Sequence, residues 1–239
     1  MTNSNKPKII GSQSWQQLLF LHWRMPAARI QAILPKALRV QTYDGDAWLA
    51  VVPFSMEKVR PWWSPPVPGI SWFLETNVRT YVQHDNGQTG VWFLSLDANH
   101  RLAVTIAQKF WHLNYRAARM VQQTSEATIR YSGSCRNVSA EYSIECRLPT
   151  NQSLHSAAED SLEHFLLERY HLFAQKPDDS FLVGQVHHAP YQYQHVDLRQ
   201  CYQTLTHSHG IPINADRPPD HVAYSPGVSV QVSALKPIE

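Results

Sequence analysis

Glycine and cysteine are scarce in this sequence, and several familiar signatures of function are missing. Nine glycines in 239 residues leave little room for phosphate-cradling loops, and neither a P-loop nor a G-x-G-x-x-G motif occurs. A G-x-S-x-G nucleophile elbow is also absent. No C-x-x-C pair is formed by the three cysteines, Cys135, Cys146 and Cys201, which argues against a structural zinc site.

Long apolar runs and blocks of like charge are missing as well. The formal net charge of +2 is spread along the chain, which argues against nucleic acid as the main partner. No stretch approaches the length of a membrane span, and the N-terminal residues lack the apolar run of a signal peptide. With so few cysteines, we expect a cytoplasmic protein that has no membrane partner.

The sequence does contain enough apolar residues for a core, since 43% of it is hydrophobic and 11% is aromatic. Runs rich in β-branched and aromatic residues dominate, with no repeat or long linker between them. We predict a mainly β (α+β) protein whose single domain spans residues 1–239. Helices are predicted at 157–173, 115–120 and 198–205, and a strand at 102–110. A D-G turn signal between two β-like runs over 40–54 predicts a β-hairpin there.

The most informative segment is 71–97, where two β-like runs flank the turn signal D-N-G and predict a β-hairpin. Because side chains alternate along a strand, Glu75, Asn77, Arg79 and Tyr81 share one face. Such a row suits the solvent-facing side of an antiparallel sheet, which the residues alone favour. It also suits the polar lining of a pocket, so the second interpretation stays open.

Other features carry weaker signals. Thirteen histidines invite a metal hypothesis, but none has a carboxylate at a fixed ligand spacing, so we predict no metal site and no cofactor. Lys109 is the lysine inside a β-like run, and we expect it at an exposed strand end. Arg169 is predicted to be a structural anchor. The loop with Trp62 and Trp63 either packs on the body, covers a pocket or forms a homo-oligomer contact.

The order of several short motifs carries a family resemblance over nearly the whole chain. They are H-W-R-M-P, I-L-P-K-A-L, D-G-D-A-W-L-A-V-V-P-F, E-T-N-V-R-T-Y-V, G-V-W-F-L-S-L-D-A, F-L-L-E-R-Y-H-L-F, V-H-H-A-P-Y and Y-S-P-G-V-S-V. This succession resembles the YqjF-like family of uncharacterised bacterial proteins, which looks like a distant branch of the acetoacetate decarboxylase-like superfamily.

The resemblance implies an antiparallel, cone-shaped β-barrel with a few outer helices and an internal pocket. It also implies that Glu75 stands where acetoacetate decarboxylases have an inward-facing glutamate, which reverses the preference for a solvent-facing row. Asn77, Arg79 and Tyr81 then point into the pocket, and Asp97, at the end of the partner strand, is expected to face it too.

The chain departs from the decarboxylases at the catalytic segment. Tyr115 and Arg116 stand where that family has its two lysines, and neither can form an imine. We therefore predict a pocket for a small organic acid or carbonyl compound, with Glu75, Tyr115 and Arg116 as candidate acid–base and anion-binding groups. The chemistry is predicted to be of lyase or hydratase type without a Schiff base. The alternative is a non-catalytic binding or sensor module.

Overall fold

The computed structural model describes residues 8–149 and 153–238, apart from the side chains of residues 109 and 110. Its helical elements are α1 (Ala27–Gln31), α2 (Arg101–Trp111), α3 (Leu162–Leu167) and the 3-10 helix η1 (Leu205–His209). Its strands are β1 (Ile9–Met25), β2 (Leu38–Val40), β3 (Thr42–Tyr43), β4 (Asp46–Pro61), β5 (Phe73–His84), β6 (Thr89–Ala98), β7 (Tyr115–Thr124), β8 (Thr128–Cys135), β9 (Glu141–Arg147), β10 (His171–Gln175), β11 (Phe181–His187), β12 (Gln194–His195), β13 (Asp197–Gln203), β14 (His221–Ser233) and β15 (Lys236–Pro237).

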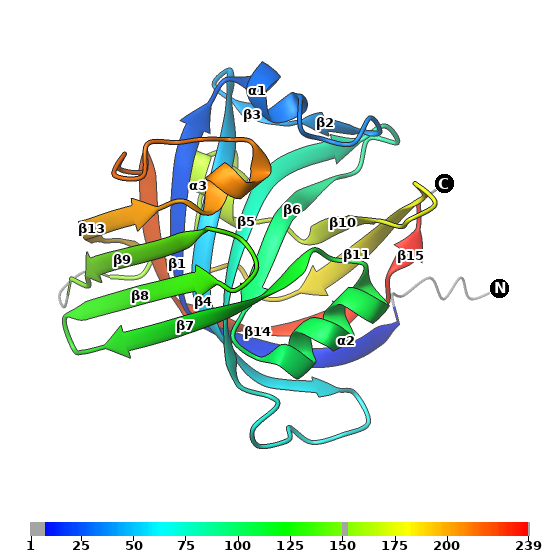
Figure 1. Ribbon diagram of the computed structural model, residues 1–239, viewed down its shortest axis with the longest axis horizontal. Helices are drawn as coiled ribbons and strands as arrows, with labels where there is room; N and C mark the ends of the chain where they lie inside the picture. Colours follow the sequence, from blue (N-terminus) through cyan, green and yellow to red (C-terminus); the bar gives the residue numbers. More distant parts are fainter. Residues whose placement is uncertain (1–7, 150–152, 239) are drawn as a thin grey trace.

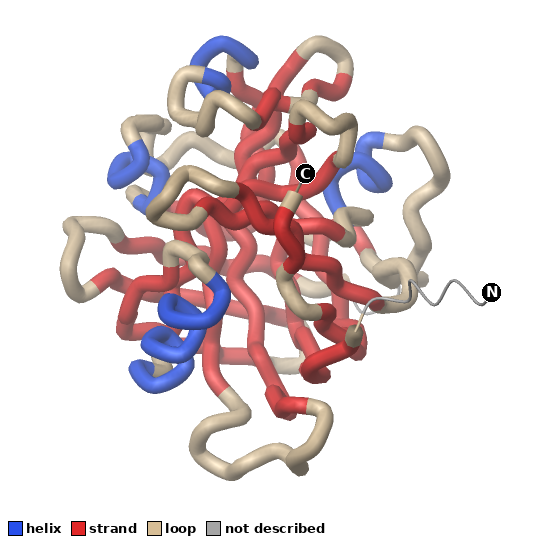
Figure 2. The backbone as a smooth tube through the Cα atoms, turned by 90° about the vertical axis from the view of Figure 1, so that its right-hand side faces the viewer, coloured by secondary structure: helices blue, strands red, loops and turns tan. Residues whose placement is uncertain are grey.

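Strands dominate the fold, so the prediction of a mainly β protein with few helices is confirmed. The strand order runs β13-β9-β8-β7-β6-β10-β11-β14-β1-β4-β5-β2, and β5 also pairs with β6. The pairings from β6 through β10, β11, β14, β1, β4 and β5 therefore return to β6. The strands occupy the centre of the molecule and the helices lie at its periphery (Figures 1 and 2).

Both predicted hairpins form. In the D-N-G hairpin, β5 and β6 pair antiparallel, and the turn is closed by a hydrogen bond from Gly87 N to His84 O of 2.8 Å. In the D-G hairpin, Asp44 and Gly45 have φ values of 50° and 84° between β3 and β4. Positive φ at both central residues is the geometry that favours glycine in two-residue turns.

A β-bulge interrupts β6. Val78 pairs with Ser95 while Arg79 pairs with Phe93, so Leu94 is an extra residue on the β6 side. One extra residue reverses the side-chain alternation beyond it. Phe93 and Leu96 consequently lie on the same face of the sheet, and both line the internal cavity.

Both faces of β5 are buried. Tyr81 packs in an apolar cluster with Phe20, Val52 and Phe54, whereas Val78 packs in a second cluster with residues of β8 and β9. The four-stranded layer of β7, β8, β9 and β13 is seen extending to the side of the main ring in Figure 1. Covering β5 on both sides removes the solvent-facing surface that an isolated hairpin would have.

Two predictions between residues 102 and 120 are wrong. The segment predicted as a strand is the helix α2. His100, which precedes the helix, caps it by accepting a hydrogen bond from Ala103 N with its side chain. The segment after Asn114, predicted as a helix, is β7, which pairs with both β6 and β8. The i, i+3, i+4 spacing of Ala103, Ile106 and Ala107 was the missed helical signal, since all three line the cavity.

Two predicted helices near the C-terminal half also differ. Instead of one helix over 157–173, a short helix α3 starts after Ser161, whose side chain accepts from His164 N, and β10 follows. The segment 198–205 is mostly the strand β13, which pairs with β9. In each case pairing with a distant strand decides the conformation, and local propensity does not encode that.

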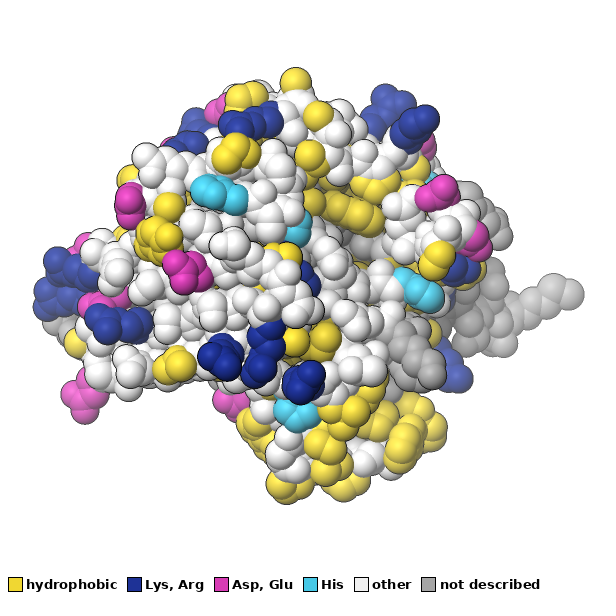
Figure 3. Space-filling model, in the orientation of Figure 1, with side chains coloured by type: hydrophobic (Ala, Val, Ile, Leu, Met, Phe, Trp, Pro, Cys, Tyr) yellow, Lys and Arg dark blue, Asp and Glu magenta, His cyan; other side chains and the backbone are white. Residues whose placement is uncertain are grey.

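The loop after β4 exposes its tryptophans. Trp62 and Trp63 are 67% and 71% exposed, and Trp72 is 43% exposed. Apolar side chains gather where this loop protrudes at the lower edge of Figure 3. The homo-oligomer contact therefore stays a prediction for this surface. Among the residues that the structure describes, no helix has the length and apolar character needed to cross a membrane.

Candidate functional site

An internal cavity of about 260 Å³ lies inside the ring of paired strands. Most of the side chains around it are apolar, and its strand and helix residues come from β1, β4, β5, β6, β7, α2, β10, β11 and β14. Ile70, at the end of the tryptophan loop, and Ile106 of α2 also line it, and both are partly exposed. The cavity therefore reaches the surface between that loop and α2.

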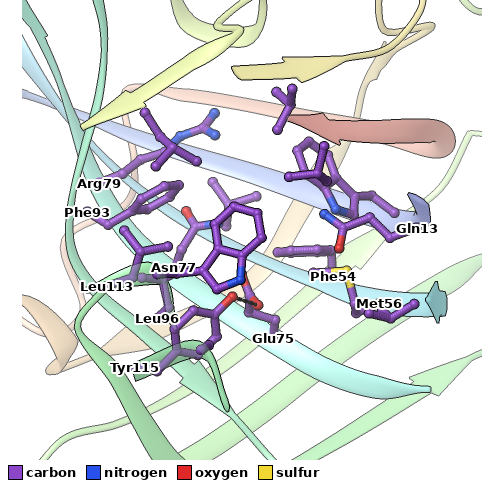
Figure 4. A pocket seen from close by; sticks show the side chains of 18 of the residues that line it. Gln13, Phe54, Met56, Glu75, Asn77, Arg79, Phe93, Leu96, Leu113 and Tyr115 are labelled. Atoms are coloured by element: carbon purple, nitrogen blue, oxygen red, sulfur yellow. Dashed lines mark hydrogen bonds between the residues drawn. The ribbon is translucent and has the colours of Figure 1, made fainter. Parts of the chain in front are cut away.

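The polar row of β5 forms one wall of this cavity. Glu75, Asn77 and Arg79 all line it, and their residues are only 2%, 5% and 8% exposed. Figure 4 shows Asn77 between Glu75 and Arg79 along the strand, with Phe93 and Leu96 beside them. The structure thus brings three of the residues singled out from the sequence to one cavity.

Glu75 and Tyr115 form a hydrogen-bonded pair at one end of the row. The Tyr115 hydroxyl donates to Glu75 Oε2 over 2.8 Å (Figure 4). Burial raises the pKa of Glu75 to about 8, the Tyr115 hydrogen bond opposes that rise, and the Asp97 charge adds to it. Burial and the adjacent Glu75 hold the pKa of Tyr115 well above its usual value. The carboxyl is therefore poised to gain or lose a proton near neutral pH.

Arg79 stands at the other end of the row as a buried cation. Its Nη2 donates to Leu166 O at 3.4 Å, and its Nε has no hydrogen-bond partner among the described residues. No ion pair in the described part of the chain includes Arg79. Asn77 Oδ1 and Trp15 Nε1, which also border the cavity, are likewise without partners there. Arg79 Nε and Trp15 Nε1 are donors in this state and favour a polar, anionic ligand, whereas Asn77 Oδ1 can accept a hydrogen bond.

Tyr81 follows Arg79 on the same face but has its hydroxyl engaged elsewhere. The hydroxyl donates to Leu166 O over 2.9 Å and lies 2.9 Å from His22 Nε2. His22 Nδ1 in turn lies 3.0 Å from His221 Nδ1. Tyr81 is not among the residues that line the cavity, and its ring supports the Arg79 guanidinium at 5.9 Å.

Asp97 and Arg116 are not brought to the cavity. The bulge at Leu94 turns Asp97 to the face of Thr76, with which it pairs. There Asp97 accepts two hydrogen bonds from Arg116, of 2.6 and 3.0 Å, and one from Cys135 Sγ. Tyr115 and Arg116 point to opposite sides of β7, so only Tyr115 meets the polar row. Arg116 lines a separate polar hollow beside α2.

We expect Asp97→Ala to lower the free energy of unfolding by about 3–5 kcal/mol, because it leaves Arg116 half-buried without its carboxylate. Ligand binding in the cavity should be unchanged in the folded variant. Urea unfolding measures the first effect and calorimetric titration the second. The control is Asp85→Ala, which breaks an exposed pair with Arg39 and should cost less than about 1 kcal/mol. An equal loss in both variants would contradict a structural role for the Asp97 pair.

Several residues of the cavity were not found from the sequence. Arg169 lines it, donating from Nε to Phe165 O and from Nη1 to Gln41 Oε1. Burial and the neighbouring Arg79 charge lower the pKa of Arg169. The others that matter for shape are Gln13, Trp15, Phe54, Trp111, His171 and Tyr191. They come from distant elements, so no local pattern groups them.

Metal ligation finds no support in the part of the chain that the structure describes, where no group of three or more His, Cys, Asp or Glu side chains could hold an ion. No lysine is among the described residues lining the cavity. Lys109 belongs to α2, but its side chain lies outside the described residues.

Comparison with solved structures gives the fold class. The protein has an acetoacetate decarboxylase-like fold, with a TM-score of 0.65 to an acetoacetate decarboxylase-like enzyme from Sphingomonas wittichii RW1, at 12% identity over 98% of this chain and 94% of that one. The acetoacetate decarboxylase of Legionella pneumophila gives 0.61, at 12% identity over 98% and 88% of the two chains. The enduracididine biosynthesis enzyme MppR, complexed with pyruvate, also gives 0.61, at 11% identity over 99% and 93%.

The sequence comparisons give the family. Residues 12–229 match the model of the DUF2071 family, described as an uncharacterized conserved protein, and the chain belongs to that family. It is 34% identical over 211 residues to the uncharacterized protein YqjF of Bacillus subtilis strain 168. The aligned region covers 88% of this chain and 86% of that protein. The YqjF-like identification made from the motifs is thereby confirmed.

Proposed function

We propose that this protein binds a small organic acid carrying a carbonyl group and transfers a proton on it. Arg79 carries the proposal, because its buried guanidinium has an unpaired Nε and no carboxylate partner among the described residues, and so calls for an anion in the cavity. The ring of strands would then act as the cone-shaped barrel that shields this ion pair from water. The pyruvate bound by MppR, a protein of the same fold, supports an organic acid as ligand.

The proposed chemistry uses the Glu75–Tyr115 pair. A carboxyl with a pKa of about 8 can take a proton from the carbon next to a carbonyl and return it near neutral pH. The Tyr115 hydroxyl would move its hydrogen bond from Glu75 to the substrate carbonyl oxygen, stabilising the enolate as it forms. Asn77 would orient the substrate between this pair and Arg79. Proton transfer of this kind underlies lyase, hydratase and isomerase reactions.

Exchange of substrate protons with solvent tests this function. Oxo acids incubated with the protein in D₂O should lose the proton NMR signals of the carbons next to the carbonyl faster than in buffer alone. The control variant Glu126→Gln changes an exposed carboxylate and should exchange at the parental rate. Binding without any acceleration of exchange would instead establish the non-catalytic binding or sensor module, which the mostly apolar lining of the cavity favours.

A Schiff base is not part of the proposal, because no described lining residue is a lysine. We expect that borohydride reduction in the presence of pyruvate or a longer oxo acid attaches no ligand to the protein, as measured by intact mass. Attachment at Lys109, located by peptide mapping, would overturn this expectation and return the protein to imine chemistry.

A further inference from the structure

We infer that the ligand is an extended oxo acid whose carbonyl lies about four or five carbon–carbon bonds from its carboxylate, as in 5-oxohexanoate and 6-oxoheptanoate, rather than a 2-oxo or 3-oxo acid. This inference rests on the proposed function, because it takes Arg79 as the carboxylate site and the Glu75–Tyr115 pair as the carbonyl site. It adds the distance between those two sites, which selects the class of substrate.

The spacing follows from the strand. Glu75 and Arg79 are four residues apart in the regular part of β5, which places their Cα atoms about 13 Å apart at about 3.3 Å per residue. Side chains stand roughly perpendicular to a sheet, so this separation is largely kept at the cavity wall. Figure 4 shows the two side chains at opposite ends of the row, with Asn77 between them.

The electrostatics agree with this separation. The groups that shift the pKa of Glu75 are Tyr115 and Asp97, and Arg79 is not among them. By contrast, the Arg79 charge acts on Tyr81, Tyr191 and Arg169. The cationic end and the acid end of the row are therefore distinct sites within one cavity.

Subtracting one hydrogen bond of about 3 Å at each end leaves about 7 Å for the ligand between its two polar groups. A carboxylate carbon–oxygen bond of about 1.2 Å and four or five carbon–carbon bonds, each advancing about 1.3 Å along an extended chain, cover that length. In pyruvate and acetoacetate the carbonyl is one and two bonds from the carboxylate carbon, too close to reach both sites.

The side chains around the row fit the same ligand. Between its two polar ends, the row is flanked on the same sheet by apolar side chains that line the cavity, since Val52 and Leu96 pair with Asn77 and Phe54 pairs with Glu75. A methylene spacer matches that surface, whereas a polar spacer would leave its groups without partners.

A length series in calorimetric titration tests the inference. Each oxo acid is paired with the plain alkanoate of equal carbon number, because added methylenes tighten binding to an apolar wall by themselves. The pairs are levulinate with pentanoate, 5-oxohexanoate with hexanoate, and 6-oxoheptanoate with heptanoate, and pyruvate is measured beside them. We expect the oxo acid to bind at least about fivefold tighter than its alkanoate in the last two pairs only.

Two variants assign the ends of the ligand. Tyr115→Phe should abolish the preference of 5-oxohexanoate over hexanoate and leave the affinity for hexanoate within about twofold, whereas Arg79→Met should weaken both. The inference would be overturned if pyruvate binds more tightly than every longer acid and Arg79→Met weakens its binding. That result would leave the proposed function intact. If none of these acids binds, or if their affinity is the same in Arg79→Met as in the parent, both the inference and the proposed function are overturned.

Discussion

Replacing Arg79 with methionine is expected to lower the affinity for organic acids at least about 100-fold while raising the free energy of unfolding by about 1–3 kcal/mol. The guanidinium is buried, its Nε has no partner in the described part of the chain, and its contact to Leu166 O is long at 3.4 Å. Methionine has a similar length and no desolvation cost. Some stabilisation is offset by the lost contacts of the guanidinium with the Phe20 and Tyr81 rings.

Urea unfolding without ligand and calorimetric titration with an organic acid measure the two effects on the same preparations. Arg119→Met is the matched control, because it removes an exposed arginine from β7 and should change neither quantity appreciably. A variant of Arg79 that is destabilised and still binds would show that the guanidinium holds the fold rather than the ligand. Stability gained as function is lost is the usual mark of a binding group.

Glu75→Gln is expected to remove a large pH dependence of stability as well as the exchange activity. The pKa of Glu75 is raised from its ordinary value of 4.5 to about 8 in the folded protein, first of all by burial. Between those two values the folded state holds a proton that the unfolded state has released, so stability falls as pH rises. The loss is about 3–5 kcal/mol once the pH exceeds 8.

Glutamine is neutral at every pH, so the variant should match the parent near pH 4 and be more stable by the same 3–5 kcal/mol at pH 9. Chemical unfolding across this range gives the comparison, with Glu126→Gln as the control that keeps the parental slope. Exchange in D₂O should fall at least about 100-fold in the Glu75 variant. Parallel stability profiles of the parent and the Glu75 variant would mean that folding does not shift the pKa of the Glu75 carboxyl.

The sequence predicts the hairpins well because their turns are local. D-N-G and D-G specify their geometry within a few residues, and both hairpins form where they are expected. It fails where pairing with a distant strand decides the conformation, as in β7, β10 and β13. For α2 the apolar and β-branched residues resemble a strand, although the spacing of the cavity-lining side chains is helical.

The polar row shows a different limit. Alternation correctly places Glu75, Asn77 and Arg79 on one face, but it does not tell a wall of a cavity from a surface, since both faces of β5 are covered here. The family resemblance favoured the cavity. Arg169, Trp111 and His171 reach the same cavity from other elements, and only the folded chain brings them together.

The bulge at Leu94 makes the chemistry of this wall depend on strand register. Leu96 and Ala98 share the cavity face with Phe93 only because one extra residue stands before Ser95. If β6 kept Leu94 but paired continuously from Phe93 onward, without the bulge, Ser95 would stand opposite Asn77 and Asp97 opposite Glu75, on the cavity face. An evolving relative can thus exchange an apolar wall for an acidic one without replacing any side chain, a route to new substrates that comparisons of aligned residue types would overlook.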